Sequence, residues 1–199
     1  MNDPTSRRLA TRAVHAGARS SKPDYIPTVT PIHHSSTYWY ESLEDLDAVF
    51  EGTREGYVYT RYGNPTVTAL EEAVAALEEG EASLAFASGM AAIHAALLAL
   101  GARSGTTVVA AQDIYGATYA LLDGLMRSQG VATRFVDTAD LDAVEAACAE
   151  MKPAALIAET ISNPLLKVAD LPVLAKVAHR HGAALLVDHT FATPCLAKP

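Results

Sequence analysis

The chain has 199 residues, of which 50% are hydrophobic and 19% are charged, and its formal net charge at pH 7 is -8. This composition is typical of a soluble globular protein, and the length allows one layered domain with a sizeable core. The acidic balance argues against nucleic acid or an anionic membrane surface as a partner, because both bind basic surfaces.

The cysteines and the apolar stretches indicate the cellular compartment of the protein and whether it spans a membrane. Cys148 and Cys195 offer neither a disulfide framework nor the paired spacing of a metal site. We therefore expect a reducing compartment and a cytoplasmic protein. The apolar stretch 85–100 is short and interrupted by polar residues and glycine, so it predicts a buried helix and no membrane span.

Residues 1 to about 40 show no sustained hydrophobic period and contain several prolines. We expect an extended arm with one or two short strands, which lies on another subunit or on the main domain. The aromatic cluster Tyr38-Trp39-Tyr40 is a natural anchor for this arm. Arg7, Arg8 and Arg12 suggest an organelle transit segment only faintly, because the segment is short and includes an acidic residue.

Two helices are expected after the arm. Residues 41–50 are acidic and carry leucine, valine and phenylalanine on one face, which is typical of a short amphipathic helix. Asn64 is a good N-cap and Pro65 a good first helical residue, so a second helix begins there and ends before Gly80. The inner face of this second helix carries Leu70, Ala73, Val74 and Leu77.

The segment before that cap, Tyr57-Val-Tyr-Thr-Arg61-Tyr, places three tyrosines and an arginine in six positions. It can be an amphipathic surface loop. It also contains the residues with which a loop holds an anion beside an aromatic ring, and both interpretations stay open at this point.

The stretch Ala85-Phe86-Ala87-Ser88-Gly89-Met90, followed by an apolar run to Leu100, predicts a buried strand, a tight turn and a helix. Small residues at Ser88 and Gly89 let the backbone approach a ligand closely, and the helix they open directs free N–H groups and a positive dipole end toward it. This arrangement suits a phosphate. A plain turn before a plain core helix is the commoner meaning of such a stretch.

From Ser83 onward, short apolar strands alternate with helical stretches. This is the signature of an α/β fold with a mostly parallel sheet covered by helices on both faces. The expected strands are Ser83 to Ala87, Thr107 to Ala111, Ala132 to Val136, Ala155 to Glu159, and Ala184 to Val187. An apolar stripe that includes Cys148 predicts one helix over 141–151, and Asp170 begins another.

Ligands of such sheets bind at the carboxyl ends of the strands. Polar or aromatic residues follow four of the expected strands, in the segments Ser88-Gly89-Met90, Asp113-Ile-Tyr115-Gly116, Glu159-Thr-Ile-Ser-Asn163-Pro164, and Asp188-His189-Thr190. A carboxylate, an aromatic ring, an amide and an anion-binding turn at one edge suggest a planar cofactor with a phosphate and a basic nitrogen.

Five motifs of the chain match one family. They are Tyr57-Val-Tyr-Thr-Arg-Tyr-Gly-Asn-Pro-Thr66, Ala87-Ser-Gly-Met90, Asp113-Ile-Tyr-Gly-Ala-Thr118, Glu159-Thr-Ile-Ser-Asn-Pro-Leu165, and Val187-Asp-His-Thr-Phe-Ala-Thr-Pro194. In this order, and across most of the chain, they resemble the pyridoxal-phosphate enzymes of Cys/Met metabolism, the cystathionine γ-synthases, cystathionine γ-lyases and their relatives. The resemblance implies the large domain of the fold type I PLP-dependent transferases, with pyridoxal 5'-phosphate (PLP) as cofactor.

The resemblance also implies which residues hold the phosphate. Ser88, Gly89 and Met90 form the phosphate-binding turn. Tyr59 and Arg61 complete the anion site from a neighbouring subunit, a task that suits arginine because its guanidinium pairs two phosphate oxygens at once.

A second set of residues is implied for the cofactor ring. Tyr115 stacks on the pyridine ring, and Asp188 pairs with the ring nitrogen and keeps it protonated, so that the ring withdraws electrons from the bound amino acid. Asn163 lies near the phenolic oxygen and Thr190 lies beside the ring. Tyr115 and Tyr59 are also the candidate catalytic residues.

One residue of the family pattern is missing. The family forms its Schiff base with PLP through a lysine in a Ser-x-Thr-Lys setting after the aspartate-containing strand, and no lysine of this sequence has that setting; Lys198 is expected to be solvated. We therefore expect an N-terminal portion, in which residues 1–60 form an arm and inter-subunit loop, residues 61–199 form an incomplete PLP-binding large domain, and the C-terminal domain is absent. Alone, such a chain is expected to be inactive and marginally stable.

The implied activity of the parent enzyme is elimination or replacement on a small amino-acid substrate, cystathionine or a homoserine ester. The resemblance implies a homo-oligomer, a dimer of dimers. Ala117 stands where methionine γ-lyases carry cysteine, which disfavours that activity, while His189, Ile161 and Cys195 also depart from the usual residues. An alternative is a non-catalytic fragment or interaction module that retains PLP-phosphate binding.

Other site chemistries are disfavoured. His179, His181 and His189 have no partner carboxylate that the sequence identifies, so surface histidines are expected and no metal. Ser88 lacks the glycine that a nucleophile elbow has two residues before its serine. A dinucleotide-binding fold would need a GxGxxG turn, which the sequence does not contain.

Overall fold

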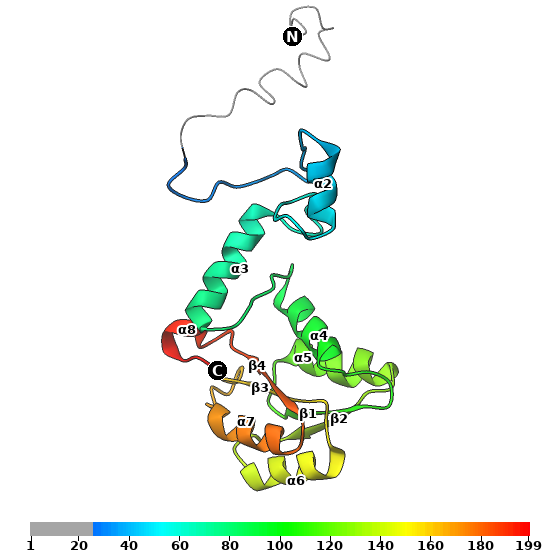
Figure 1. Ribbon diagram of the computed structural model, residues 1–199. Coiled ribbons are helices and arrows are strands. Elements are labelled where there is room, and N and C mark those ends of the chain that lie inside the picture. Colours follow the sequence, from blue (N-terminus) through cyan, green and yellow to red (C-terminus); the bar gives the residue numbers. More distant parts are fainter. Residues whose placement is uncertain (1–25) are drawn as a thin grey trace, which may run out of the picture. The chain divides into compact units, whose positions relative to one another are not determined.

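The computed structural model describes residues 26–199. The first part of the expected arm, with Arg7, Arg8 and Arg12, lies outside the described residues. The chain divides into two compact units, Met1–Thr66 and Val67–Pro199. Figure 1 labels the α-helices and strands of both units.

In the first unit, α2 spans Leu43–Phe50 and is capped by Ser42, whose hydroxyl accepts a hydrogen bond from the N–H of Asp45. The expected short helix is confirmed. It begins two residues after Glu41, because Ser42 takes the N-cap position that its side chain favours.

Hydrogen bonds, rather than a core, hold the described part of the first unit together. Thr37 and Tyr59 form an isolated antiparallel bridge, which is the strand pairing found there. Asn64 is 5% exposed, and its amide nitrogen donates to the carbonyl of His33 at 3.1 Å and to the hydroxyl of Tyr38 at 3.0 Å. No hydrophobic side chain is buried in this described part.

One parallel sheet forms the centre of the second unit. Its strands are β1 (Thr107–Ala111), β2 (Ala132–Val136), β3 (Ala155–Glu159) and β4 (Ala184–Asp188). The strand order is β2-β1-β3-β4, and every neighbouring pair is parallel. The parallel α/β sheet is therefore confirmed, with β4 one residue longer than expected.

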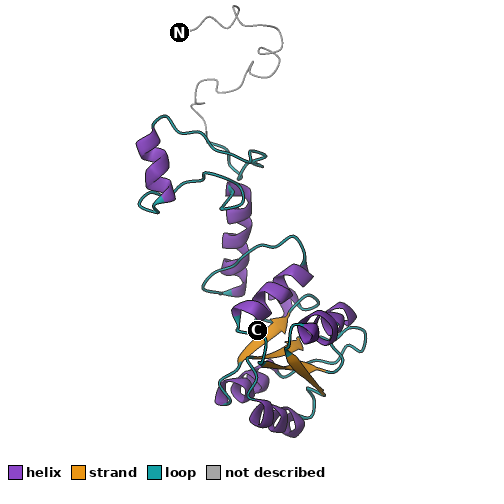
Figure 2. Ribbon diagram, turned by 90° about the vertical axis from the view of Figure 1, so that its right-hand side faces the viewer, coloured by secondary structure: helices purple, strands orange, loops and turns teal. Residues whose placement is uncertain are grey.

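Helices cover both faces of this sheet (Figure 2). Successive strand residues point to opposite faces, and Val108 and Val109 accordingly belong to different core clusters. The Val108 cluster takes residues from α4 (Gly89–Ala99) and from the π-helix η2 (Leu121–Met126), which follows the short α5 (Gly116–Ala120). The Val109 cluster takes residues from α6 (Leu141–Met151) and α7 (Leu171–Arg180).

The helices of the second face begin where the sequence predicts. Asp140 caps α6 and Asp170 caps α7, each accepting a hydrogen bond from the backbone N–H three residues later. Cys148 is fully buried in the α6 stripe, whereas Cys195 lies exposed in α8 (Thr193–Leu196). Within residues 26–199, no helix combines the length and the apolar content that a membrane span requires.

The expected strand Ser83 to Ala87 is wrong for this structure. Within the described residues it pairs with no other strand, and the N–H of Ala85 donates instead to the carboxylate of Glu71 at 2.8 Å. Leu84 is 73% exposed. A strand forms only where a neighbour satisfies its backbone groups, and an apolar pattern does not reveal whether that neighbour is present.

The expected inner face of α3 (Pro65–Glu78) is not buried. The helix begins at Pro65 as predicted, and the N–H of Thr66 donates to the side-chain oxygen of Asn64 at 2.9 Å. An amphipathic pattern predicts which face of a helix is apolar, but not what covers that face. The exposed residues of this face are Leu70, Ala73, Val74 and Leu77.

Candidate functional site

A cavity of about 410 Å³ lies at the carboxyl ends of β3 and β4 and beside the N-terminus of α4. Pockets for small ligands commonly enclose about 300–1,000 Å³. All four strand-end segments that the sequence singled out contribute to it. It is lined by Ser88, Gly89, Met90, Tyr115, Glu159, Ile161, Asn163, Asp188, Thr190 and Phe191.

The predicted site residues divide between the two units. Those of the phosphate turn and the ring set, from Ser88 to Thr190, line the cavity. Tyr59 and Arg61 lie in the first unit, where the guanidinium of Arg61 lies 4.9 Å from the centroid of the Tyr59 ring and 5.3 Å from that of Tyr62. Their part in the site stays a prediction.

The N-terminus of α4 presents free backbone donors to the cavity. The hydroxyl of Ser88 caps the helix by accepting from the N–H of Ala91 at 3.1 Å. The N–H groups of Gly89 and Met90 belong to the first turn, where a helix provides no carbonyl for them. A Cβ atom added at Gly89 would meet no other atom within 4 Å, so space for a ligand lies directly over this turn.

Asp188, at the end of β4, is held by Thr190. One carboxylate oxygen of Asp188 accepts from the N–H of Thr190 at 3.1 Å and from its hydroxyl at 2.6 Å. The second oxygen has no hydrogen-bond partner among the described residues. A carboxylate oxygen that is oriented but unused, at the edge of a cavity, is suited to accept a hydrogen bond from a ligand.

Glu159 lies at the end of the neighbouring strand β3 and is 7% exposed. Its carboxylate accepts from the N–H of Tyr115 at 2.6 Å and from the N–H of Asn163 at 3.0 Å. Burial raises the pKa of Glu159, and these two hydrogen bonds oppose the rise. Sequence reasoning gave Glu159 no role, because nothing in its motif shows which backbone groups face it.

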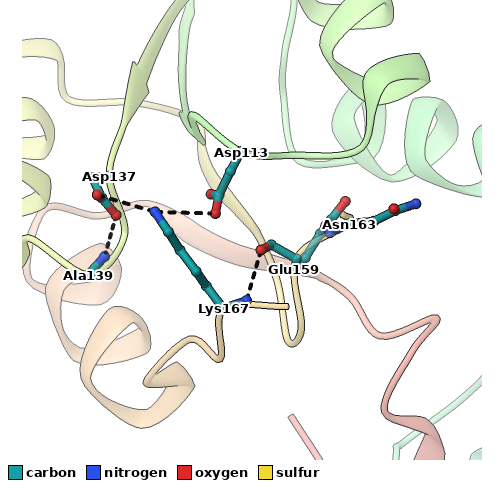
Figure 3. Close-up of polar contacts among 7 residues, drawn as sticks. Asp113, Asp137, Ala139, Glu159, Asn163 and Lys167 are labelled. Carbon is teal, nitrogen blue, oxygen red and sulfur yellow. Dashed lines mark hydrogen bonds and ion pairs between the residues drawn. The ribbon is translucent and has the colours of Figure 1, made fainter. Parts of the chain in front are cut away.

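Lys167 connects the loops that follow β1, β2 and β3. Its ammonium nitrogen lies 3.6 Å from the nearer carboxylate oxygen of Asp113 and 3.5 Å from that of Asp137. Figure 3 shows the lysine between these two aspartates, with Glu159 and Asn163 beside them. The N–H of Ala139, and then Lys167, lower the pKa of Asp137.

Two of the three histidines differ from the expected surface histidines. His179 is exposed, but His181 is half-buried, and its Nε2 lies 2.7 Å from the carboxylate of Glu145 on α6. This hydrogen bond is the main reason why the pKa of Glu145 is lowered. The sequence did not reveal this partner, because Glu145 and His181 are 36 residues apart and come together only when α6 and α7 pack side by side.

His189 is also half-buried and joins two segments. Its Nδ1 lies 2.7 Å from the hydroxyl of Thr160, and its Nε2 lies 3.0 Å from the carbonyl oxygen of Ala197. Because a carbonyl only accepts, Nε2 carries a proton. Among residues 26–199, no group of three or more His, Cys, Asp and Glu side chains is arranged to hold a metal ion.

The match to a known family covers most of the chain. The model of the family described as Cys/Met metabolism PLP-dependent enzyme matches residues 10–199. The chain belongs to this family. The resemblance drawn from the five motifs is thereby confirmed.

Members of the Cys/Met metabolism PLP-dependent family are similar over almost the whole chain. The L-methionine gamma-lyase of Fusobacterium nucleatum subsp. nucleatum is 42% identical over 192 residues, which make up 96% of this chain and 48% of that protein. The probable cystathionine gamma-synthase of Herpetosiphon aurantiacus is 39% identical over 195 residues, 96% of this chain and 56% of that protein. Because the sequence identities to the gamma-lyase and to the gamma-synthase are so similar, they do not distinguish between these two activities.

A solved structure of a relative has the same fold. The crystal structure of metB from Corynebacterium glutamicum matches with a TM-score of 0.79 and 37% sequence identity, over 99% of this chain and 49% of that one. The expected fold type I architecture is confirmed. The chain spans about half the length of the relatives it matches.

Proposed function

We propose that this chain is the cofactor-binding portion of a PLP-dependent enzyme of sulfur amino-acid metabolism, of the cystathionine γ-lyase or γ-synthase type. The whole enzyme then catalyses elimination or replacement on cystathionine or a homoserine ester. The observation that carries the proposal is one cavity that combines the open N-terminus of α4 with an unused carboxylate oxygen of Asp188. When bound, PLP supplies an electron-withdrawing ring that stabilises negative charge on the amino-acid substrate.

The turn at the start of α4 fits the phosphate of PLP. The N–H groups of Gly89 and Met90 donate to phosphate oxygens, and the positive end of the helix dipole favours the anion. The hydroxyl of Ser88 is already engaged with the N–H of Ala91, so its contribution is to hold the turn in place.

The opposite side of the cavity fits the cofactor ring. Asp188 accepts a hydrogen bond from the ring nitrogen and holds a proton there, while Thr190 keeps the carboxylate oriented. Tyr115, which is 44% exposed at the cavity, offers its ring for stacking. The amide of Asn163 provides a donor for the phenolic oxygen.

The positions of the lysines support non-covalent binding by this chain. Among residues 26–199, no lysine lines the cavity. Lys198 is exposed, as expected, and forms a surface ion pair with Glu79, and Lys167 is held by Asp113 and Asp137. In this proposal the covalent anchor of the whole enzyme is a lysine outside this sequence.

The proposal includes a second copy of the chain. Tyr59 and Arg61 of a neighbouring subunit complete the phosphate site in a homo-oligomer, a dimer of dimers, with residues 1–60 as arm and inter-subunit loop and residues 61–199 as part of the large domain. The absence of any buried hydrophobic side chain in residues 26–66 supports an interface there.

Replacing Gly89 with alanine tests the phosphate site. The added methyl group meets no protein atom within 4 Å, so the free energy of unfolding should change by no more than about 1 kcal/mol. The methyl group enters the space assigned to the phosphate, and the dissociation constant for PLP should rise about 10-fold. Fluorescence titration with PLP measures this constant.

Gly124→Ala is the matched control for this substitution. Gly124 lies in η2, also has no atom within 4 Å of an added Cβ, and does not line the cavity. Its alanine variant should bind PLP like the wild type. If Gly89→Ala also binds PLP like the wild type, the phosphate does not lie at this turn.

A further inference from the structure

Glu159 is a buried carboxylate in an acidic setting. It is the last residue of β3, its partner in the sheet register is Asp188, and both line the cavity. Burial raises the pKa of Glu159, and the neighbouring carboxylates of Asp188 and Asp113 add to the rise. Burial and two neighbouring carboxylates make the charged form of Glu159 unfavourable, so other groups must stabilise this charge.

Two backbone N–H groups compensate this charge. That of Tyr115 donates to one oxygen at 2.6 Å, and that of Asn163 donates to the other at 3.0 Å. Tyr115 belongs to the loop after β1 and Asn163 to the loop after β3, so one carboxylate joins loops from two strands. Hydrogen bonds to a charged acceptor are roughly twice as strong as neutral ones.

The ion pair of Lys167 connects the same two loops at a different point. Lys167 follows β3, and its ammonium lies 3.6 Å from the carboxylate of Asp113, two residues before Tyr115 (Figure 3). Lys167 thus offsets the charge of Asp113, one of the two carboxylates that face Glu159. Among the described residues, Lys167 forms no hydrogen bond or ion pair with Tyr115 or Asn163, whose N–H groups donate to Glu159.

We propose that Glu159 is a positioning residue of the cavity: its two carboxylate oxygens hold the N–H groups of Tyr115 and Asn163 and so fix the spacing of the two side chains. The proposal rests on the proposed function, which gives this spacing its use, since Tyr115 stacks on the PLP ring and Asn163 reaches its phenolic oxygen. Glu159→Gln keeps the size of the side chain but replaces one of its two acceptor oxygens with an NH₂ group, which only donates, so one of the two N–H groups loses its acceptor.

Nuclear magnetic resonance of the ligand-free chain tests this hydrogen-bonded link directly. In the wild type, the amide signals of Tyr115 and Asn163 should shift together with pH, with one midpoint above the ordinary glutamate value of about 4.3. Both signals report the ionisation of Glu159, so Glu159→Gln should abolish the shared transition. Separate midpoints, or no transition in the wild type, would overturn the proposal without need of any variant.

The affinity of the chain for PLP tests whether the link matters to the site. The Glu159→Gln variant should bind PLP about 10-fold more weakly than the wild type, because one backbone N–H group loses its hydrogen bond to the carboxylate. Asp137→Asn is the control, because Asp137 lies at the same edge of the sheet and pairs with Lys167, but does not line the cavity. This control should bind PLP like the wild type.

Thermal unfolding separates positioning from a structural role alone. A structural role would lower the melting temperature of Glu159→Gln while the folded chain kept its wild-type affinity for PLP, and that result would overturn the proposal. If the wild-type chain bound no PLP, the proposed function would fail, whereas the shared amide transition would still decide whether Glu159 fixes the two loops.

Discussion

Asp188→Asn is expected to weaken PLP binding about 10- to 100-fold, because in the proposed site the protonated ring nitrogen loses a charged acceptor. Thr190 occupies one oxygen of Asp188 through its N–H and its hydroxyl. The other oxygen has no partner among the described residues and is the group assigned to the cofactor. Asparagine has nearly the same shape, so the substitution removes the charge and leaves the turn at the end of β4 intact. Fluorescence titration with PLP gives the two dissociation constants.

Asp123→Asn is the control for the change in net charge. Asp123 lies on η2, pairs with Arg127 at 3.1 Å on the surface, and does not line the cavity. Its asparagine variant should bind PLP like the wild type. Equal weakening in both variants would show that the overall charge governs binding, and an unchanged affinity in Asp188→Asn would remove Asp188 from the ring site.

Leu97→Ala is expected to lower the free energy of unfolding by about 2–5 kcal/mol. Leu97 is 0% exposed and belongs to the core cluster on the face of the sheet that α4 covers. Its truncation leaves a cavity that neighbouring side chains fill only in part. Domains are commonly stable by only about 5–15 kcal/mol, so this loss is a large fraction of the total. Urea unfolding followed by circular dichroism measures it.

The next residue along α4 provides a matched comparison. Leu98 has the same side chain but is 49% exposed, so Leu98→Ala should cost less than about 1 kcal/mol. Equal costs for the two leucines would contradict the packing of α4 on the sheet. Because Gly89 and Met90 begin this helix, that result would also remove the support of the phosphate turn.

The parallel sheet was predictable because its strands are short, almost entirely apolar and separated by capped helices. Residues 155–159, for example, form an apolar run that is followed directly by a polar motif, and β3 has the bounds that this pattern predicts. The helix starts at Asp140 and Asp170 follow from side chains that cap their own backbone, an interaction only three residues long. Interactions between residues so close in the chain can be predicted from the sequence.

The sequence does not show which distant segment, if any, packs against a given strand or helix. Residues 83–87 have the composition of a buried strand, yet within the described residues no strand pairs with them. Leu70 and Leu77 lie on the apolar face of α3 and are exposed for the same reason. A pattern predicts which surface an element can bury, whereas burial itself depends on a second element.

The candidate site shows the same division. The motifs predicted that Gly89, Tyr115, Asn163 and Asp188 lie at the strand ends, and the cavity brings these residues together. The contacts of Glu159 could not be predicted, because they join its carboxylate to backbone N–H groups, one of them 44 residues away. Side-chain identity carries no information about such backbone partners.

Binding of PLP is tested most directly by comparing the affinity of the unmodified chain for PLP with its affinity for pyridoxal, which lacks the phosphate. We expect saturable binding of one PLP per chain and binding of pyridoxal at least about 10-fold weaker, because the proposed site holds the phosphate at the N-terminus of α4. Equal affinities for the two compounds, or no saturable binding of PLP, would contradict the assignment of this cavity as a PLP site.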